Sequence, residues 1–333
     1  MEPIGIFANV EFWRDYGNRA ETILSSFGKR AVRLVLPEDG PLPEPELGAI
    51  EIATFNGYWE VDERFTRRFF GVLLRAPRLA WFHAPNAGVD HPVFARLLER
   101  GVYLTTSAGA NAQPVAHSVL GGMLALARGF PHWWQAQQRR EWSKLGEQRP
   151  DLAGQTVVLV GLGAIGQEVA RLLQPFGLTV IGVRQRLQPL PFVNEVVPYE
   201  EIDRVLPWAH WLVLCCPLTE KTQGLVSARR LALLPDGARL INVSRGAVVD
   251  EEALIAQLRS GKLAGAYLDV FCEEPLPPSS PLWSLPNVII SPHDAAGALG
   301  NRARVSELFL DNLERFLRGA PMRNLVGSRA KEA

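Results

Sequence analysis

Three short segments in the second half of the sequence contain the residue types that bind an acid and move a proton. They are Asn242-Val243-Ser244-Arg245-Gly246, Asp269 to Pro275, which includes Glu274, and Ser291-Pro292-His293. A fixed guanidinium can bind a carboxylate through two parallel hydrogen bonds, which suits an acidic substrate. An imidazole exchanges a proton with a hydroxyl or carbonyl oxygen near neutral pH, and a neighbouring carboxylate keeps it charged. Together the segments predict a site that binds a small acid and protonates a carbonyl oxygen.

Each of the three side chains also has a purely structural interpretation. Arg245 could form a surface ion pair, Glu274 could lie in a solvated loop, and His293 could be a loop histidine with satisfied hydrogen bonds. All three segments, however, follow apolar runs that predict strands. The carboxyl ends of parallel strands form the edge at which a doubly wound sheet binds ligands, so this shared placement favours a functional site.

A glycine-rich turn is the next chemical signal. Gly161-Leu162-Gly163-Ala164-Ile165-Gly166 follows the strand predicted up to Val160 and opens a helix expected to run to about Phe176. Glycines at these spacings permit a tight turn and let the backbone approach a pyrophosphate, while the amides of the helix start face the phosphates. The context predicts a dinucleotide site, and a turn without a ligand is the alternative.

The tip of the following strand bears on the choice of dinucleotide. An acidic residue at this place would bind the ribose 2′-hydroxyl of NAD, but the sequence reads Val183-Arg184-Gln185-Arg186. Arginines there can instead form charge-assisted hydrogen bonds to a 2′-phosphate. The sequence therefore predicts NADP as the preferred cofactor over NAD, with Arg184 and Arg186 as cofactor-binding residues. The alternative is that both arginines are solvated surface charges.

The elements that must position these residues follow a regular pattern. Short apolar runs rich in Val, Ile and Leu alternate with segments of helical spacing, which is typical of parallel strands joined by crossover helices. Strands are predicted in a first series at Ile4–Val10, Ala31–Leu36, Ile50–Phe55, Leu79–Ala84 and Val102–Thr106. A second series is predicted at Val157–Gly161, Thr179–Val183, Trp211–Cys215, Arg239–Val243, Ala266–Val270 and Val288–Ile290. The pattern predicts an α/β protein with two Rossmann-like, doubly wound domains, mostly parallel sheets and a cleft between them.

Two further helical patterns suggest how the domains are connected. A helix expected over Gln113–Arg128, with a polar, tryptophan-rich stretch after it through Arg149, should link the two series. The last helical pattern, Ala303–Leu317, comes after the second series, and we expect its apolar face to return to the first domain. The predicted division is a discontinuous substrate-binding domain of residues 1–107 plus 298–333 and a dinucleotide-binding domain of residues 108–297.

Length and composition agree with this division. The 333 residues suit two domains of about 150 residues each. The 35 Lys and Arg are balanced by 35 Asp and Glu, which gives no electrostatic reason to expect nucleic acid or an anionic membrane as a partner. Met1–Val10 lacks the basic region of a signal peptide, and no apolar run reaches the roughly 18 residues of a membrane helix. Cys215, Cys216 and Cys272 have no metal-site spacing. We therefore expect a cytoplasmic protein without a metal.

With these motifs in place, the sequence resembles the D-isomer-specific 2-hydroxyacid dehydrogenases. The glycine turn, Cys216-Pro217-Leu218-Thr219, Asn242 to Asp250, Asp269 to Pro275 and Ser291-Pro292-His293 look like the linked motifs of that family, in order. The resemblance covers nearly the whole chain, most closely residues 108–317. It implies that Arg245 binds the carboxylate and carbonyl oxygen of the substrate, that His293 is the general acid or base, and that Glu274 orients and charges His293.

The resemblance also implies binding residues outside this trio. Ala87, Gly88 and Val89, with Asp90, look like the family loop whose backbone amides hold the substrate carboxylate, and a simple tight turn is the alternative. Asp269 would contact the nicotinamide carboxamide, and Cys216, Pro217, Val243 and Ser244 would belong to the loops around the cofactor. Family members are usually dimers, so we expect a homodimer.

The sequence thus predicts an NADP-preferring reductase of a small 2-oxo acid, such as glyoxylate or hydroxypyruvate, with His293 protonating the carbonyl oxygen. The rival is a dinucleotide-sensing, dimeric interaction protein of the corepressor kind with little catalysis. A dehydrogenase of phosphorylated acids such as 3-phosphoglycerate is less favoured, because the stretch after Leu317 is too short for an appended regulatory domain.

Several other residues carry weaker expectations. Asp294 stands where the family usually has a small or apolar residue, and it could raise the pKa of His293 or alter which substrates fit. Four residues could line the substrate site or equally belong to the core: Phe55, Asn56, Trp59 and Trp81. His83, His91, His132 and His210 are expected to be structural, and Trp133, Trp134 and Trp142 to pack at a domain or subunit surface.

Overall fold

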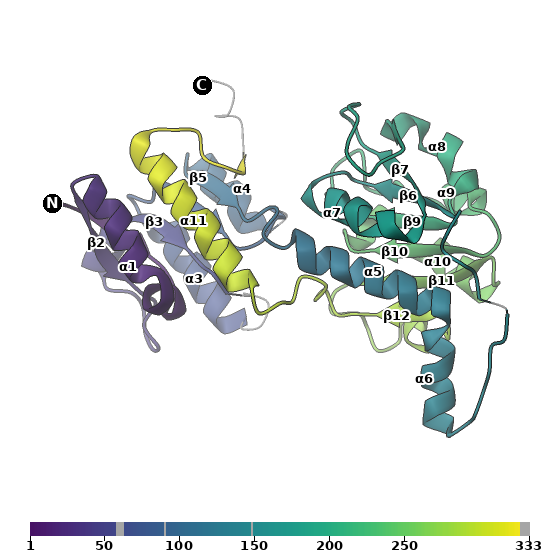
Figure 1. Cartoon of the computed structure of the whole chain (residues 1–333). Helices are drawn as coiled ribbons and strands as arrows, with labels where there is room; N and C mark the ends of the chain where they lie inside the picture. Colours follow the sequence, from purple (N-terminus) through teal and green to yellow (C-terminus); the bar gives the residue numbers. More distant parts are fainter. Residues whose placement is uncertain (58–62, 90, 148, 327–333) are drawn as a thin grey trace. The chain divides into compact units, whose positions relative to one another are not determined.

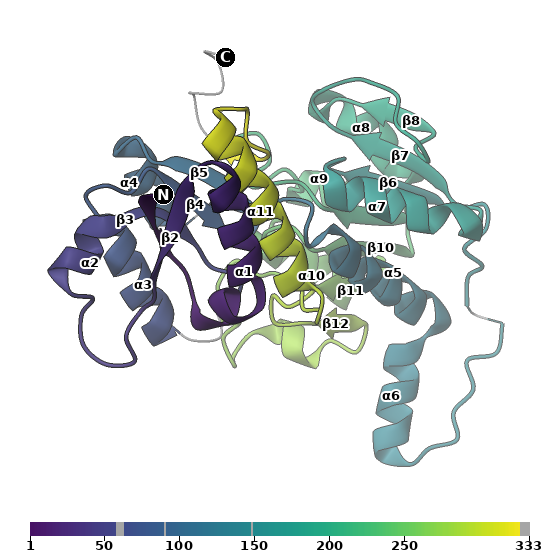
Figure 2. The same cartoon turned by 60° about the vertical axis from the view of Figure 1, so that its left-hand side comes forward.

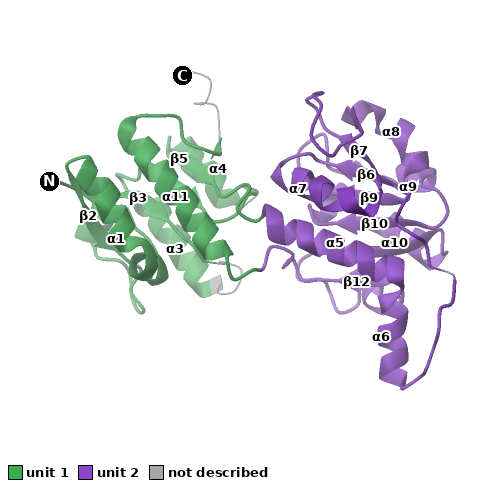
Figure 3. Cartoon of the chain, viewed as in Figure 1, with its two compact units in different colours: residues 1–111, 298–333 green, residues 112–297 purple. Residues whose placement is uncertain are grey.

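The computed structural model describes residues 1–57, 63–89, 91–147 and 149–326. Its chain divides into two compact units, residues 1–111 with 298–333 and residues 112–297 (Figures 1 and 3). The chain therefore passes from the first unit to the second between residues 111 and 112, whereas the sequence predicts this domain boundary between residues 107 and 108. Two candidate residues, Trp59 and Asp90, lie outside the described residues.

The first unit is built on a sheet of six strands in the order β13-β5-β4-β3-β1-β2. Its strands are β1 (Glu2–Phe7), β2 (Lys29–Leu34), β3 (Ile50–Thr54), β4 (Trp81–Ala84), β5 (Tyr103–Thr106) and β13 (Leu325–Val326). All neighbours pair in parallel except β13, which is antiparallel to β5. Parallel strands need crossovers, and the helices that supply them cover both faces of the sheet.

The helices of this unit are α1 (Val10–Ser26), α2 (Glu44–Ala49), α3 (Glu63–Arg75), α4 (Pro92–Glu99) and α11 (Asn301–Arg318). Helices α1 and α11 lie side by side over one face (Figure 2), and Phe12 packs edge-on against Phe309 between them. Along β1, Ile4 and Ile6 belong to this core, whereas Phe7 belongs to the core of the opposite face. The alternation follows from the two-residue period of a strand.

The second unit has a wholly parallel sheet of seven strands in the order β12-β11-β10-β9-β6-β7-β8. They are β6 (Thr156–Val160), β7 (Thr179–Val183), β8 (Glu195–Val197), β9 (Trp211–Leu214), β10 (Ala238–Asn242), β11 (Leu263–Leu268) and β12 (Val288–Ile290). Its helices are α5 (Ala112–Arg128), α6 (Phe130–Arg139), α7 (Ala164–Leu173), α8 (Ile202–Val205), α9 (Ala228–Leu233) and α10 (Glu251–Arg259). Alternate residues of β6 enter the cores on its two faces. Both units thus have the expected Rossmann-like, doubly wound construction.

Some predicted elements needed correction. The strand expected over Ile4–Val10 ends at Phe7, because Val10 begins α1 with 62% of its surface exposed. The helix expected over Gln113–Arg128 is α5, which packs on α7 and β11 in the second unit, the domain in which the predicted division also places it. Strands β8 and β13 and helix α6 were not predicted. Among the described residues, no helix is both long enough and apolar enough to cross a membrane.

Candidate active site

The structure brings Glu274 and His293 into direct contact. The Nδ1 atom of His293 lies 2.7 Å from Oε2 of Glu274, and the Phe271 amide donates a 3.0 Å hydrogen bond to Oε1 of the same carboxylate. The hydrogen bond to Glu274 raises the pKa of His293 above its ordinary value, against the effect of burial. Burial would raise the pKa of Glu274, but the bonds from His293 and Phe271 bring it below its ordinary value. The contact therefore favours a charged pair.

Arg245 lies near this pair, on the segment that follows β10. Its charge lowers the pKa of both Glu274 and His293, so its guanidinium is within electrostatic reach of the two. The segment is held locally: the Arg245 amide donates to Ser244 Oγ at 2.6 Å, and Nη1 of Arg245 donates to the Ser244 carbonyl at 2.7 Å. The Asn242 side chain bridges the turn by accepting from the Ser244 amide and donating to the Arg245 carbonyl.

Gly246 lets the segments of this trio approach one another. A Cβ atom at this position would lie 1.9 Å from the carbonyl carbon of Phe271, so only glycine fits against that backbone. Phe271 is also the residue whose amide binds Glu274. The loops after β10 and β11 are therefore packed backbone to backbone, and this contact sets where Glu274 lies relative to Arg245.

Asp269 anchors the segment that carries His293. Only 3% of its surface is exposed, and its Oδ1 accepts hydrogen bonds from Ser291 Oγ at 2.5 Å and from the Asp294 and Ala295 amides at 2.9 Å. The His293 amide donates to the Asp269 carbonyl at 2.8 Å. His293 itself has a φ of 53°, a left-handed conformation that is unfavourable for residues other than glycine. The hydrogen bonds to Asp269 hold the segment in this conformation.

The glycine turn lies between β6 and α7, as predicted. Gly161 has a φ of 96°, and a Cβ there would lie 2.6 Å from the Cα of Cys216. Gly163 and Ala164 are exposed, Ile165 is partly buried and Gly166 is buried in the first turn of α7. A Cβ built on Gly163 would meet no atom within 4 Å. The start of α7 thus presents open backbone whose first amides have no partner within the helix.

The segment that follows β7 contacts polar residues that the sequence did not point to. Arg184 is partly buried and its amide donates to the Val197 carbonyl, while Arg186 is exposed. Gln185 between them accepts a 2.9 Å hydrogen bond from Nζ of Lys221, which also lies 3.4 Å from Glu200. Lys221 and Glu200 were not predicted, because neither belongs to a recognisable motif.

The remaining cofactor candidates lie in the loops after β9 and β10. Cys216, Val243 and Ser244 are buried, and the Pro217 carbonyl accepts a 2.6 Å hydrogen bond from Thr222 Oγ1. Burial raises the pKa of the Cys216 thiol to about 11, so it stays protonated at neutral pH. These loops and the glycine turn all follow strands that are neighbours in the sheet, and they therefore share one edge.

In the first unit, the candidate loop Ala87–Gly88–Val89 lies between β4 and α4. The Asn86 side chain donates to the Gly88 carbonyl at 2.8 Å, and the Ser107 amide donates to the Asn86 carbonyl at 2.9 Å. Ala87 is exposed, while Gly88 and Val89 are partly buried. Three residues that were candidates for lining a substrate site, Phe55, Asn56 and Trp81, are buried inside the unit.

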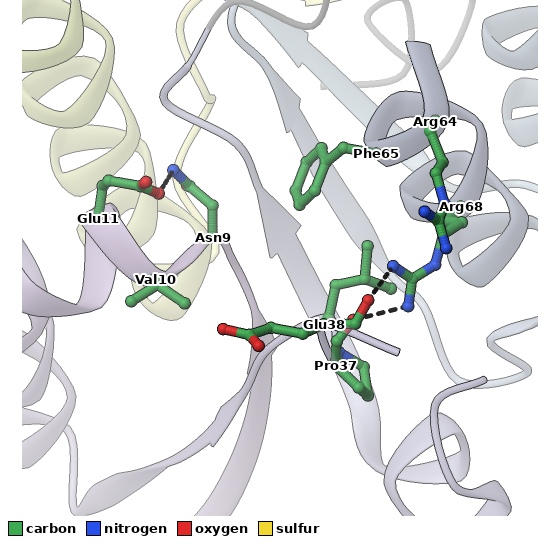
Figure 4. Close-up of a pocket in the computed structure, with 9 residues that line it drawn as sticks. Asn9, Val10, Glu11, Pro37, Glu38, Arg64, Phe65 and Arg68 are labelled. Atoms are coloured by element: carbon green, nitrogen blue, oxygen red, sulfur yellow. Dashed lines mark hydrogen bonds between the residues drawn. The ribbon is translucent and has the colours of Figure 1, made fainter. Parts of the chain in front are cut away.

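The first unit also has a hollow that the sequence did not predict. It measures about 330 Å³ and is lined by residues that follow β1 and β2 and by the start of α3 (Figure 4). Arg68 points toward the carbonyls of Pro37 and Glu38 and binds both, at 2.6 and 2.8 Å, while Glu11 accepts a 2.7 Å hydrogen bond from Asn9. The side chains of Arg68 and Glu11, two of the charged residues that line the hollow, are thus engaged with its walls.

Comparison with known proteins identifies the family. Residues 120–295 match the model of the D-isomer specific 2-hydroxyacid dehydrogenase, NAD binding domain. The chain belongs to this dehydrogenase family. The resemblance proposed from its motifs is thereby confirmed, and so is the expectation of a nicotinamide dinucleotide as its cofactor.

Individual proteins that are similar to this chain agree with the family assignment. A glyoxylate reductase from Thermofilum pendens is 34% identical over 257 residues, which cover 74% of this chain and 75% of the relative. A D-3-phosphoglycerate dehydrogenase from Methanocaldococcus jannaschii is 30% identical over 309 residues, covering 87% of this chain and 58% of the relative. Among solved structures, a family member from Xanthobacter autotrophicus Py2, in complex with NADPH and MES, is 32% identical with a TM-score of 0.76, and 99% of each chain is covered.

The residues of this dehydrogenase fit a dinucleotide. The open space over Gly163 and the exposed start of α7 leave room for a pyrophosphate against backbone amides. The close approach of Gly161 to Cys216 keeps this turn tight. The basic side chains of Arg184 and Arg186, which follow β7, suit a phosphate on the ribose of such a dinucleotide. The family match therefore agrees with the local geometry.

Proposed function

We propose that the chain reduces a small 2-oxo acid, of the size of glyoxylate or hydroxypyruvate, to the D-2-hydroxy acid with NADPH as the reductant. The observation that carries this proposal is the 2.7 Å contact between Glu274 and His293, with Arg245 within electrostatic reach. Such a trio combines a cation for an acid group with a proton donor whose charge is maintained by a carboxylate.

His293 acts as the general acid. Its Nδ1–H is engaged by Glu274, which leaves the proton on Nε2 to be donated to the substrate. The bound dihydronicotinamide supplies the hydride that adds to the carbonyl carbon. As that bond forms, the carbonyl electron pair moves to oxygen and takes the Nε2 proton, and His293 is left neutral. Glu274 keeps the ring oriented throughout because its hydrogen bond to Nδ1 survives the transfer.

Arg245 binds the substrate acid in this proposal. The guanidinium of Arg245 offers two parallel donors to the carboxylate and also stabilises negative charge that develops on the carbonyl oxygen. Asp269 contacts the carboxamide of the cofactor, and its bonds to residues 291–295 tie that contact to the position of His293.

NADPH is proposed over NADH because Arg184 and Arg186 follow β7 without a carboxylate among residues 183–186. The relative that was solved with NADPH supports this choice. Each charge-assisted hydrogen bond to a 2′-phosphate is worth about 1.5–3 kcal/mol, so the arginines supply roughly a tenfold preference or more.

A panel of 2-oxo acids tests the proposal. Oxidation of NADPH and of NADH is followed in absorbance with glyoxylate, hydroxypyruvate, pyruvate and 3-phosphohydroxypyruvate at saturating cofactor. We expect turnover with a small 2-oxo acid and a higher kcat/KM for NADPH. Turnover confined to the phosphorylated acid would favour the phosphoglycerate dehydrogenase activity of one relative. Tight cofactor binding without turnover on any acid would favour a dinucleotide-sensing interaction protein.

We also propose that the chain forms a homodimer through α6 and the segment after it. Trp134 and Trp142 have 48% and 93% of their surface exposed, and exposed aromatic groups of this kind mark protein interfaces. Light scattering coupled to gel filtration gives the mass of the parent and of a variant with both tryptophans replaced by serine. A dimeric parent and a monomeric variant are expected, and a monomeric parent contradicts the proposal.

A further inference from the structure

The turn that follows β9 holds a lysine in a fixed place. Thr222 is buried, and its Oγ1 accepts from the Thr219 amide at 2.8 Å and donates to the Pro217 carbonyl at 2.6 Å. These bonds close the turn over residues 217–222. Lys221 precedes Thr222 directly, so its backbone is anchored although its side chain is mostly exposed. A cation on an anchored turn loses less freedom on binding a ligand than one on a loose loop.

Lys221 reaches across the edge of the sheet. The strand order places β6 between β9 and β7, so the glycine turn after β6 lies between the two loops that follow its neighbours. Nζ of Lys221 donates to Oε1 of Gln185 at 2.9 Å and thereby joins these two loops. Gln185 stands between Arg184 and Arg186. The contact thus brings a third cation to the strand tip at which the proposed function places the 2′-phosphate.

A carboxylate restrains this cation. Oε1 of Glu200, in the short helical turn Tyr199–Glu201 after β8, lies 3.4 Å from Nζ of Lys221. The ion pair is exposed, with 59% and 60% of the two side chains accessible, so it is weak and easily exchanged for another anion. Glu200 therefore competes with any phosphate for Lys221 and also repels the phosphate directly.

We propose that Lys221 is a specificity-determining residue that binds the 2′-phosphate of NADP, and that Glu200 opposes this binding. The inference rests on the proposed function for the position of the dinucleotide. It goes further by assigning discrimination between NADP and NAD to a pair of residues outside the strand tip that the sequence singled out. Lys221 and Glu200 act with opposite sign, which gives the inference two independent tests.

Equilibrium binding separates the two effects. Dissociation constants for NADPH and NADH are measured by fluorescence titration of the full chain without substrate, together with those for ADP-ribose with and without a 2′-phosphate. For Lys221→Met, which keeps the apolar stem, we expect the constant for NADPH to rise about tenfold, or about 1.4 kcal/mol, with NADH changed less than about twofold. Lys221→Arg should restore most of the loss. For Glu200→Gln, NADPH should bind about threefold more tightly.

A matched control and the ratio of constants keep the test decisive. Lys262→Met removes the partly buried lysine of another ion pair, with the exposed Asp236, remote from the strand tip in sequence and on the loop before β11. It should change neither constant. If Lys221→Met leaves the NADPH-to-NADH ratio within twofold of the parent, the inference is wrong, whichever cofactor the parent prefers. A parent that prefers NADH contradicts the cofactor choice of the proposed function instead, and the Lys221 ratio still decides the inference.

Discussion

Two histidines, one in each unit, show how the same side chain is given opposite properties. His83 lies in β4 of the first unit, fully buried, with Nδ1 2.8 Å from Thr105 Oγ1 and Nε2 3.0 Å from Ser107 Oγ. Burial lowers its pKa to about 3. His293 follows β12 of the second unit, is half-exposed and contacts a carboxylate that raises its pKa. Both sheets are doubly wound, so burial at His83 and the carboxylate partner at His293, and not the fold, decide which histidine is charged.

The partners of His83 also fix its tautomer. Trp81 Nε1 donates to Thr105 Oγ1 at 2.8 Å, and Ser107 Oγ donates to the Ala84 carbonyl at 2.8 Å. Because the Ser107 proton is used, its oxygen accepts from Nε2–H of His83, and Nδ1 accepts from the Thr105 hydroxyl. All members of this chain of bonds are neutral. A proton on Nδ1 would break it, whereas His293 gains its bond to Glu274 when protonated.

The largest effect is expected from His293→Ala. Loss of the general acid should lower kcat/KM for 2-oxo acid reduction about 10²- to 10⁴-fold. His132→Ala is the matched control, because His132 bonds only to the Ser143 hydroxyl among the contacts that the structure describes and should retain near-parent activity. Steady-state kinetics checks both, with denaturant midpoints to show that each variant folds. Near-parent turnover by His293→Ala would remove this residue from its role.

The second prediction concerns stability at acid pH. The folded pKa of His83, about 3, lies below its unfolded value of 6.5, so its contribution to stability is complete above pH 6.5 and is lost as the pH falls toward 3. The loss amounts to about 1.4 kcal/mol per pH unit. His83→Gln cannot titrate and should show a shallower fall. Urea unfolding between pH 7 and pH 4.5 measures the two slopes, with the exposed His210→Gln as control. Equal slopes for the parent and His83→Gln would contradict the burial argument.

A smaller change is expected from Glu274→Gln. Because the carboxylate raises the pKa of His293, its loss lowers that pKa, and the imidazolium is then present only at lower pH. The alkaline limb of the kcat/KM profile for reduction should move toward acid pH. Glu273→Gln removes the neighbouring exposed carboxylate and should leave the limb in place. A profile for Glu274→Gln that coincides with the parent's would show that Glu274 does not control the charge of His293.

The smallest effect is expected from Ser291→Ala. This variant deletes one of the donors to Asp269 Oδ1 but leaves the amides of Asp294 and Ala295 in place. We expect kcat to fall about three- to tenfold, the effect of one partly compensated hydrogen bond to a charged group. Ser284→Ala, which loses a bond to the Pro281 carbonyl on the surface, is the control. An unchanged kcat would mean that the amides alone hold the His293 segment.

Much of the fold was predictable because a parallel strand that is buried on both faces has a continuous run of apolar residues in its sequence. Strands β7 and β12 have the predicted bounds, and the doubly wound construction of both units is confirmed. Strand β13 escaped notice because it has only two residues, and β8 because it begins with an exposed glutamate and so lacks the continuous apolar run of β12, which is equally short. The predicted boundary between residues 107 and 108 and the division of the structure between 111 and 112 differ by four residues, because the composition of the sequence does not change around Ala110.

The candidate site was predictable only where residues follow strands. Arg245, Glu274 and His293 were singled out because each lies shortly after an apolar run. The structure puts Glu274 in contact with His293 and Arg245 within electrostatic reach of both, and their roles stay a proposal. Lys221 and Glu200 were not singled out because they come together only when the turns after β9 and β8, which are separate in the sequence, meet in the folded unit. The neutral state of His83 was equally hidden, since it depends on how completely the folded unit buries the ring. Sequence spacing reports which edge a residue occupies, but not which partner it meets there.

Helix α11 has a consequence for how the chain is made. Phe309, Leu310 and Leu313 complete a core whose other members, such as Phe12 and Trp81, are synthesised far earlier. A nascent chain emerging from the ribosome can close the second unit once residue 297 is exposed, whereas the first unit must wait for residues 301–318. Its amino-terminal aromatic residues therefore spend most of translation without their partner helix, and this is the interval in which chaperones would be needed.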